Sequence, residues 1–183
     1  MTVSYIRGLV AGSTVLMLAA CAQPADEQAM IPAGIVPVTG SSAYAGEVSS
    51  VTGFGGEETN PMWTSEISSD AFQAALKASL EKAGILSDGG PLTLRADILT
   101  VEQPLMGFDV TVTMTVRYNL MDANGNIRFD RTLTSSATLG VSDEFLGVER
   151  LRKTNEAAAR ANIAQLLSVL GSRISTPAVG AIS

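Results

Sequence analysis

The side chains that most often carry out chemistry in proteins are nearly absent from this sequence. Its 183 residues contain one cysteine, Cys21, and no histidine. The commonest general base and the commonest metal ligand are therefore missing. Ser-His-Asp and Cys-His arrangements and His/Cys zinc sites are excluded. We predict no catalytic residue, no metal site and no bound cofactor, and Cys21 is left as the one residue whose position points to a modification.

An apolar run of residues 9–20 precedes Cys21, with the single basic residue Arg7 ahead of it. The run is too short for a transmembrane helix, which needs roughly 20 residues. It has the length of the apolar part of a secretory signal, which ends in small residues at a cleavage site. Because Leu18-Ala19-Ala20 stands directly before Cys21, the segment resembles the signal of bacterial lipoproteins. The alternative is an ordinary secretory signal with a chance cysteine.

The resemblance to lipoprotein signals implies a modification, an anchor and a location. It implies cleavage after Ala20, diacylation of Cys21 and usually a further acyl chain on the new amino terminus. One chain binds a membrane only marginally, at about 0.8 kcal/mol per buried methylene, but two or three hold firmly. Ala22 stands where an Asp commonly retains such proteins at the inner membrane. The family pattern thus favours the outer membrane, facing the periplasm, with inner-membrane anchoring as the alternative.

The charge balance bears on the partners of the chain. The formal net charge is −6, which argues against nucleic acid, whose binding needs basic surface, and against a polybasic contact with anionic lipids. The expected partners are the membrane, through acyl chains on Cys21, and an envelope protein, while the oligomeric state stays open. With Cys21 acylated no disulfide can form, so the domain depends on its core.

The hydropathy pattern divides the chain into four parts. We expect a signal peptide at 1–20, a lipidated N-terminus and flexible tether at 21–45, one domain at 46–171 and a tail at 172–183. The tether interpretation rests on Pro24, Pro32 and Pro37; alternatively, Ile31 and Ile35-Val36 add an edge strand or a partner contact. Within the domain we expect strands at 47–52, 92–101, 108–120 and from 127, and helices at 69–83 and 149–170.

Two patterns predict how these elements pack. Apolar and polar residues alternate from Phe108 to Leu120, with threonines on the second face, as in a strand buried on one side. The helix at 69–83 has one apolar stripe, and Gly84 ends it. We predict an α+β two-layer sandwich: a sheet of about four mostly antiparallel strands with two helices on one face, in the order β-α-β-β-β-α. The threonine face is read as solvated, or alternatively as a binding surface.

The long second helix is predicted to expose its charges. Glu156 is placed at the exposed margin of its apolar stripe, and Arg150, Arg152, Lys153 and Arg160 make its first half basic. These basic groups are read as solvated, or alternatively as a patch for an acidic partner.

Four features together resemble small envelope lipoproteins. They are the signal motif, the Pro-rich segment, the threonine-alternating strand, and the residues Phe72-x-x-Ala75-Leu76-x-x-Ser79-Leu80 followed by Ala83-Gly84. Examples are the lipoprotein that plugs the lipopolysaccharide translocon and the auxiliary lipoproteins of ABC-type envelope transporters. The resemblance implies a non-enzymatic protein that docks on membrane-protein partners. No binding residue transfers from it, because no position matches the family residue by residue.

Three functions are compatible with these features. The first is a non-enzymatic outer-membrane lipoprotein that binds or scaffolds an envelope complex. The second is a lipid or small-ligand carrier in an envelope transport system, with a groove lined by Phe108, Met114, Leu120, Leu166 and Leu170. The third is a hydrolase using Asp97, Asp109 and Asp130, since carboxylate pairs serve sugar hydrolysis. The glycines of 53–56 do not form a phosphate loop, because no GK[ST] follows. We favour the first.

Overall fold

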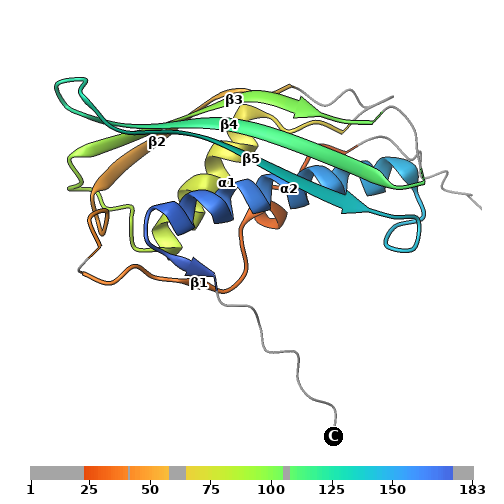
Figure 1. Ribbon diagram of the computed structural model, residues 1–183, viewed down its shortest axis with the longest axis horizontal. Helices are drawn as coiled ribbons and strands as arrows, with labels where there is room; N and C mark the ends of the chain where they lie inside the picture. Colours follow the sequence, from red (N-terminus) through yellow and green to blue (C-terminus); the bar gives the residue numbers. More distant parts are fainter. Residues whose placement is uncertain (1–22, 41, 58–64, 105–107, 175–183) are drawn as a thin grey trace, which may run out of the picture.

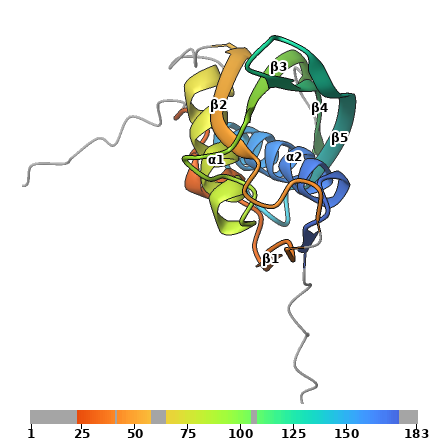
Figure 2. The ribbon, with the colours of Figure 1, turned by 90° about the vertical axis from the view of Figure 1, so that its left-hand side faces the viewer.

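The computed structural model describes residues 23–40, 42–57, 65–104 and 108–174. A four-stranded sheet forms one layer and two helices lie on one of its faces (Figures 1 and 2). The predicted fold class, an α+β two-layer sandwich, is confirmed. The elements in chain order are η1 (Gln28–Met30), β1 (Ile35–Val36), β2 (Val48–Gly55), α1 (Ser69–Lys82), β3 (Leu92–Glu102), β4 (Val110–Asp122), β5 (Ile127–Leu139), α2 (Gly147–Val169) and β6 (Arg173–Ile174).

The large sheet has the strand order β2-β3-β4-β5. β2 and β3 run parallel, with Val51 opposite Leu94, as expected for two strands joined through a helix. The remaining strands form an antiparallel meander. Their register places Arg117 of β4 between Asp97 of β3 and Thr132 of β5. The sheet is therefore mostly antiparallel, as predicted.

α1 forms where its capping signals and apolar stripe coincide. The hydroxyl of Ser68 accepts a hydrogen bond from the backbone N–H of Ala71 at 3.3 Å, which caps the first turn. Phe72 and Leu76 have no exposed surface. The helix ends before Gly84, whose φ of +67° suits a residue without a Cβ.

The core lies between β4 and α2. The alternate residues Val112, Met114, Val116, Tyr118 and Leu120 are completely buried. Burying one such aliphatic side chain contributes about 1.5–3 kcal/mol, so this strand holds the helical layer to the sheet. The alternation begins two residues later than predicted, because β4 starts at Val110.

Phe108 is therefore not part of the core. It precedes β4 and is 85% exposed. Its prediction as a core or groove residue is wrong, because period-2 alternation alone does not mark where pairing with the neighbouring strand stops.

α2 is more buried on its polar side than the sequence predicts. Arg150 and Glu156 are 7% and 5% exposed, so neither is the solvated residue expected. The carboxylate of Glu156 accepts hydrogen bonds from the Arg152 guanidinium at 2.7 Å and from the backbone N–H of Asp26 at 3.0 Å. Glu156 is thus covered by a segment from the other end of the chain, whereas the Arg150 guanidinium donates to the carbonyl of Glu144 at 2.7 Å, in the loop before α2.

That covering segment is the one predicted to be a flexible tether. From residue 23 onward it lies against the domain: Met30 has no exposed surface, and the N–H of Val38 donates to the carbonyl of Ala83 at 2.8 Å. β1 pairs antiparallel with β6, Val36 opposite Arg173. The alternative of an added strand at Ile35–Val36 describes the structure better than a tether. Residues 175–183 of the predicted tail lie outside the described residues.

Candidate functional site

The outer face of the sheet carries a regular array of hydroxyl groups. Three cross-strand pairs join β4 to β5 through side-chain hydrogen bonds, Thr111–Thr138 at 2.8 Å, Thr113–Ser136 at 2.9 Å and Thr115–Thr134 at 3.1 Å. The array follows from the alternation of β4, because its buried residues send the threonines to the opposite side. Cross-strand pairs of this kind stabilise a solvated sheet. We call these six residues the hydroxyl array.

A row of charges crosses the same face beside the hydroxyl array. Arg95 pairs with Asp97 on β3 at 2.8 Å, and Arg117 of β4 pairs with Asp130 of β5 at 2.6 Å. The Arg117 hydrogen bond holds the pKa of Asp130 below its ordinary value. The guanidinium of Arg95 also lies 4.1 Å from the ring centre of Phe54, a cation–π contact. The charges of this row therefore compensate one another.

The three carboxylates considered for hydrolysis lie on β3, on β5 and just before β4. Asp97 and Asp130 are each bound by an arginine and lie on β3 and β5, with β4 between them. Asp109 precedes β4, eight residues before Arg117, which stands opposite Asp97; at ~3.3 Å per residue this is roughly 25 Å away. Asp109 is thus too far from Asp97 for glycoside hydrolysis, which needs its two carboxyls about 5–10 Å apart, and Asp97 and Asp130 are each engaged by a guanidinium group.

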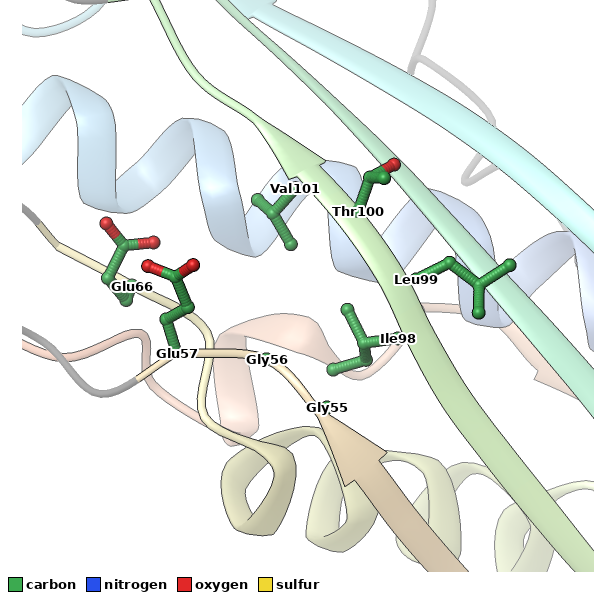
Figure 3. A pocket seen from close by; sticks show the side chains of 8 residues that line it. All are labelled: Gly55, Gly56, Glu57, Glu66, Ile98, Leu99, Thr100 and Val101. Atoms are coloured by element: carbon green, nitrogen blue, oxygen red, sulfur yellow. The ribbon is translucent and has the colours of Figure 1, made fainter.

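A cleft of about 280 Å³ opens where β2 and β3 end. Figure 3 shows the carboxylates of Glu57 and Glu66 on the same side of it, away from the side chain of Leu99. The Gln103 side-chain amide donates to Glu66 at 2.8 Å. Gly55 lines the cleft with a φ of +75°, which glycine adopts without strain, and a Cβ there would lie 2.2 Å from the carbonyl oxygen of Ile98. The glycine pair thus serves a close backbone approach, not phosphate binding.

The proposed groove between sheet and helices is filled. Four of its expected lining residues are in the packed core, with at most 1% of their surface exposed: Met114, Leu120, Leu166 and Leu170. The remaining one, Phe108, lies outside the sheet. These side chains pack against each other and leave no acyl-chain site at the place predicted.

The basic half of α2 is engaged in contacts within the chain. Arg152 forms ion pairs with Glu149 and Glu156, and Lys153 pairs with Glu144. The Arg160 guanidinium donates to the carbonyl of Ala29. These cations hold the loop before α2 and the N-terminal segment, so the surface available to an acidic partner is smaller than the sequence suggests.

Cys21 and Ala20, the predicted lipidation and cleavage residues, lie outside the described residues. The chain is first described at Gln23, whose carbonyl accepts a hydrogen bond from Ser65 Oγ at 2.7 Å. The carbonyl of Ser65 in turn accepts from the buried side-chain amide of Asn155 at 2.6 Å. Gln23, two residues after Cys21, is therefore linked to α2 through Ser65.

Sequence reasoning missed an exposed apolar surface at the start of α2. Phe108 and Phe145 are 85% and 81% exposed, and Leu146 and Val148 are also open to solvent. We call these four residues the apolar end patch. Residues 145–148 read Phe-Leu-Gly-Val, an apolar stretch without a helical or strand period, so the sequence alone predicts a connection there and not a surface.

Searches for metal and membrane features among the described residues give two findings. No group of three His, Cys, Asp or Glu side chains in the described ranges could hold a metal ion. No helix in those ranges is long and apolar enough to cross a membrane.

The fold is similar to several solved bacterial proteins. A candidate lipoprotein of Caulobacter crescentus aligns at 14% identity and a TM-score of 0.49, over 70% of this chain and 91% of its own. A minor lipoprotein of Acinetobacter baumannii aligns at 15% and 0.48, over 72% and 98%. A Xanthomonas campestris protein of family DUF330 aligns at 12% and 0.49, over 74% and 88%.

No family model and no curated protein matches this sequence. At the identities of these structural likenesses, no residue role passes from those proteins to this chain.

Proposed function

We propose that this chain is a non-enzymatic lipoprotein of the bacterial envelope, anchored to the outer membrane through acyl chains on Cys21, that holds a protein partner at the outer face of its sheet. The observation that carries the proposal is the division of the sheet into two faces. One face packs against α1 and α2, and the described residues leave the other uncovered (Figure 2).

The chemistry of the outer face supports a binding role over catalysis. Its threonine hydroxyls bond to one another, and its carboxylates Asp97 and Asp130 are held by guanidinium groups. None of these groups is arranged as a nucleophile with an adjacent base. A rigid, flat array of donors and acceptors with compensated charge is suited to a polar protein surface, which it contacts without leaving a charge unpaired.

The anchor is supported by the sequence before Gln23. Leu18-Ala19-Ala20-Cys21 follows an apolar run, and the first described residue after it is fixed to the domain through Ser65. Position 22 is Ala, and not the Asp that commonly retains bacterial lipoproteins at the inner membrane, which favours anchoring at the outer membrane.

Photo-crosslinking in living cells tests the partner. We expect a benzophenone amino acid at Thr134, on the outer face, to give one reproducible adduct with an envelope protein. The same probe at Lys77, which is exposed on α1, is the matched control and should give none. Equal adducts from both positions, or none from Thr134, would overturn the proposed face.

The anchor has its own test. Cys21→Ser should abolish incorporation of labelled palmitate and leave the precursor uncleaved. A serine variant that still matures and fractionates with the outer membrane would show that the anchor is wrong, whatever the crosslinks show.

A further inference from the structure

The apolar end patch lies at one end of the molecule, where three elements meet. β4 begins next to it, β5 ends opposite the start of β4, and α2 begins there (Figure 1). Phe108, Val141 and Phe145 line a shallow hollow of about 350 Å³ together with Arg150. Two phenylalanines with more than four fifths of their surface in water mark a surface that is used for contact, since single domains seldom expose contiguous large apolar side chains.

The N-terminal segment leads toward this same end. It runs alongside α2: the carbonyl of Ala29 accepts a hydrogen bond from Arg160, and the N–H of Asp26 donates to Glu156 at 3.0 Å. Moving back three residues in the segment, from Ala29 to Asp26, thus corresponds to moving back four residues in α2, from Arg160 to Glu156. Read backward along the chain, the segment runs toward the first turn of α2, where the apolar end patch lies.

The distance from the last contact of this segment to the patch is short. Gln23 is held through Ser65, whose carbonyl bonds to Asn155 of α2. Arg150, which borders the hollow, is five residues before Asn155: a rise of about 7.5 Å along the helix axis, with the two side chains about 140° apart around it. Cys21 is two residues before Gln23, and two extended residues reach at most about 7 Å. An acylated Cys21 therefore holds this end of the domain close to the lipid.

We propose that the apolar end patch is a second membrane contact, in which Phe108, Phe145 and Leu146 enter the boundary between headgroups and acyl chains beside the anchor. The inference rests on the proposed lipidation of Cys21. Phenyl and leucyl side chains gain free energy at that depth by leaving water. The occupant is a phospholipid surface, because the short link to Cys21 places that surface there.

The charges around the patch suit this contact. Glu144 is paired with Lys153, and Glu149 with Arg152. These two carboxylates are compensated within the domain, which lowers the repulsion that they would meet at an anionic lipid surface. Burying the patch also fixes the orientation of the domain, with the long axis of α2 pointing away from the lipid and the outer face of the sheet turned sideways.

A single-thiol probe tests the contact in the full lipoprotein. Because Cys21 is the only cysteine and its sulfur is alkylated in the mature protein, Phe145→Cys creates the one reactive thiol. The labelled lipoprotein, carrying the environment-sensitive NBD fluorophore, is placed in vesicles of phosphatidylethanolamine and phosphatidylglycerol. We expect a blue-shifted emission and quenching by phospholipids with a doxyl group on the acyl chain.

Ile127→Cys is the matched control. Ile127 is also an exposed apolar residue, 56% open to solvent, but it begins β5 at the hairpin, far from Leu139 at the strand's other end. Its label should keep the emission it has in water and escape the doxyl lipids.

The outcomes separate the two proposals. Vesicles that float with the protein while the label at position 145 behaves like that at 127 would overturn the membrane contact and leave the anchor intact. A shifted emission without doxyl quenching would also overturn it, in favour of contact between two copies. Protein that carries no lipid by mass spectrometry and does not float would overturn the anchor itself.

Discussion

The hydroxyl of Tyr118 donates a 2.7 Å hydrogen bond to Oδ1 of Asn162, and neither residue has any surface exposed to solvent. The amide of Asn162 also donates to the carbonyl of Leu133 and to Ser135 Oγ, each at 3.1 Å. One polar side chain of α2 thus joins the helix to β4 and β5. Burial also raises the pKa of Tyr118, which keeps its hydroxyl protonated as a donor.

Removing both partners of this buried pair should lower the unfolding free energy by less than the sum of the two single losses. Asn162→Leu leaves the Tyr118 hydroxyl without its acceptor, and we expect a loss of about 1–3 kcal/mol in unfolding free energy. Tyr118→Phe should cost about the same range for the same reason. The double variant should lose less than the two losses added, because no hydroxyl then remains unpaired. Urea unfolding followed by circular dichroism measures all three, and strict additivity would contradict the pairing.

The β4–β5 hairpin should weaken in acid through Asp122. The side-chain amide and the backbone N–H of Asn126 donate to this carboxylate and lower its pKa to about 2. Its folded pKa is below its unfolded one, so the stability it contributes is present above about pH 4 and is lost as the pH falls toward 2.

The stability of Asp122→Asn should therefore fall less steeply than that of the parent protein between pH 4 and 2. Urea midpoints across this window check it. Asp88→Asn, on an exposed turn, removes the same charge outside the hairpin and serves as the control. Parallel pH profiles for the parent and Asp122→Asn would contradict this role.

The segment before β2 should contribute to global stability. Met30 is completely buried against the domain, so Met30→Ala should lower the unfolding free energy by about 2–5 kcal/mol through lost burial and the cavity left behind. Val36→Ala, in the same segment but 41% exposed, should change it by less than about 0.5 kcal/mol. Thermal unfolding compares the two. A neutral Met30→Ala would mean that this segment is the loose tether that the sequence suggested.

The sequence predicts the fold where periodicity is strong and local. The alternation of β4 and the apolar stripe of α1 locate both elements to within two residues. The strand pairing follows because the connections allow few arrangements. The alternation of β4 also places its half of the hydroxyl array, since Thr111, Thr113 and Thr115 each lie between two buried residues.

The sequence does not predict contacts that depend on distant partners. β1 is two residues long and pairs with β6, more than 130 positions away, so neither shows a pattern of its own. Glu156 reads as a surface residue because the segment that covers it is remote in sequence. Asn162 interrupts an apolar stripe, and only the facing hydroxyl of Tyr118 explains why a polar residue is placed there.

The pairing of β1 with β6 also sets an order of events for the growing chain. Ser172 Oγ donates to the carbonyl of Val36 at 2.6 Å, next to the two-residue ladder. A chain is synthesised with its N-terminus first. The ladder can therefore form only after β6, near the end of the described residues, has been made. The loop that this β1–β6 ladder closes spans nearly the whole domain. Such a long-range pairing forms slowly, but its entropic cost grows only slowly with loop length. Completion of the C-terminal end is thus the step that locks the first segment in place.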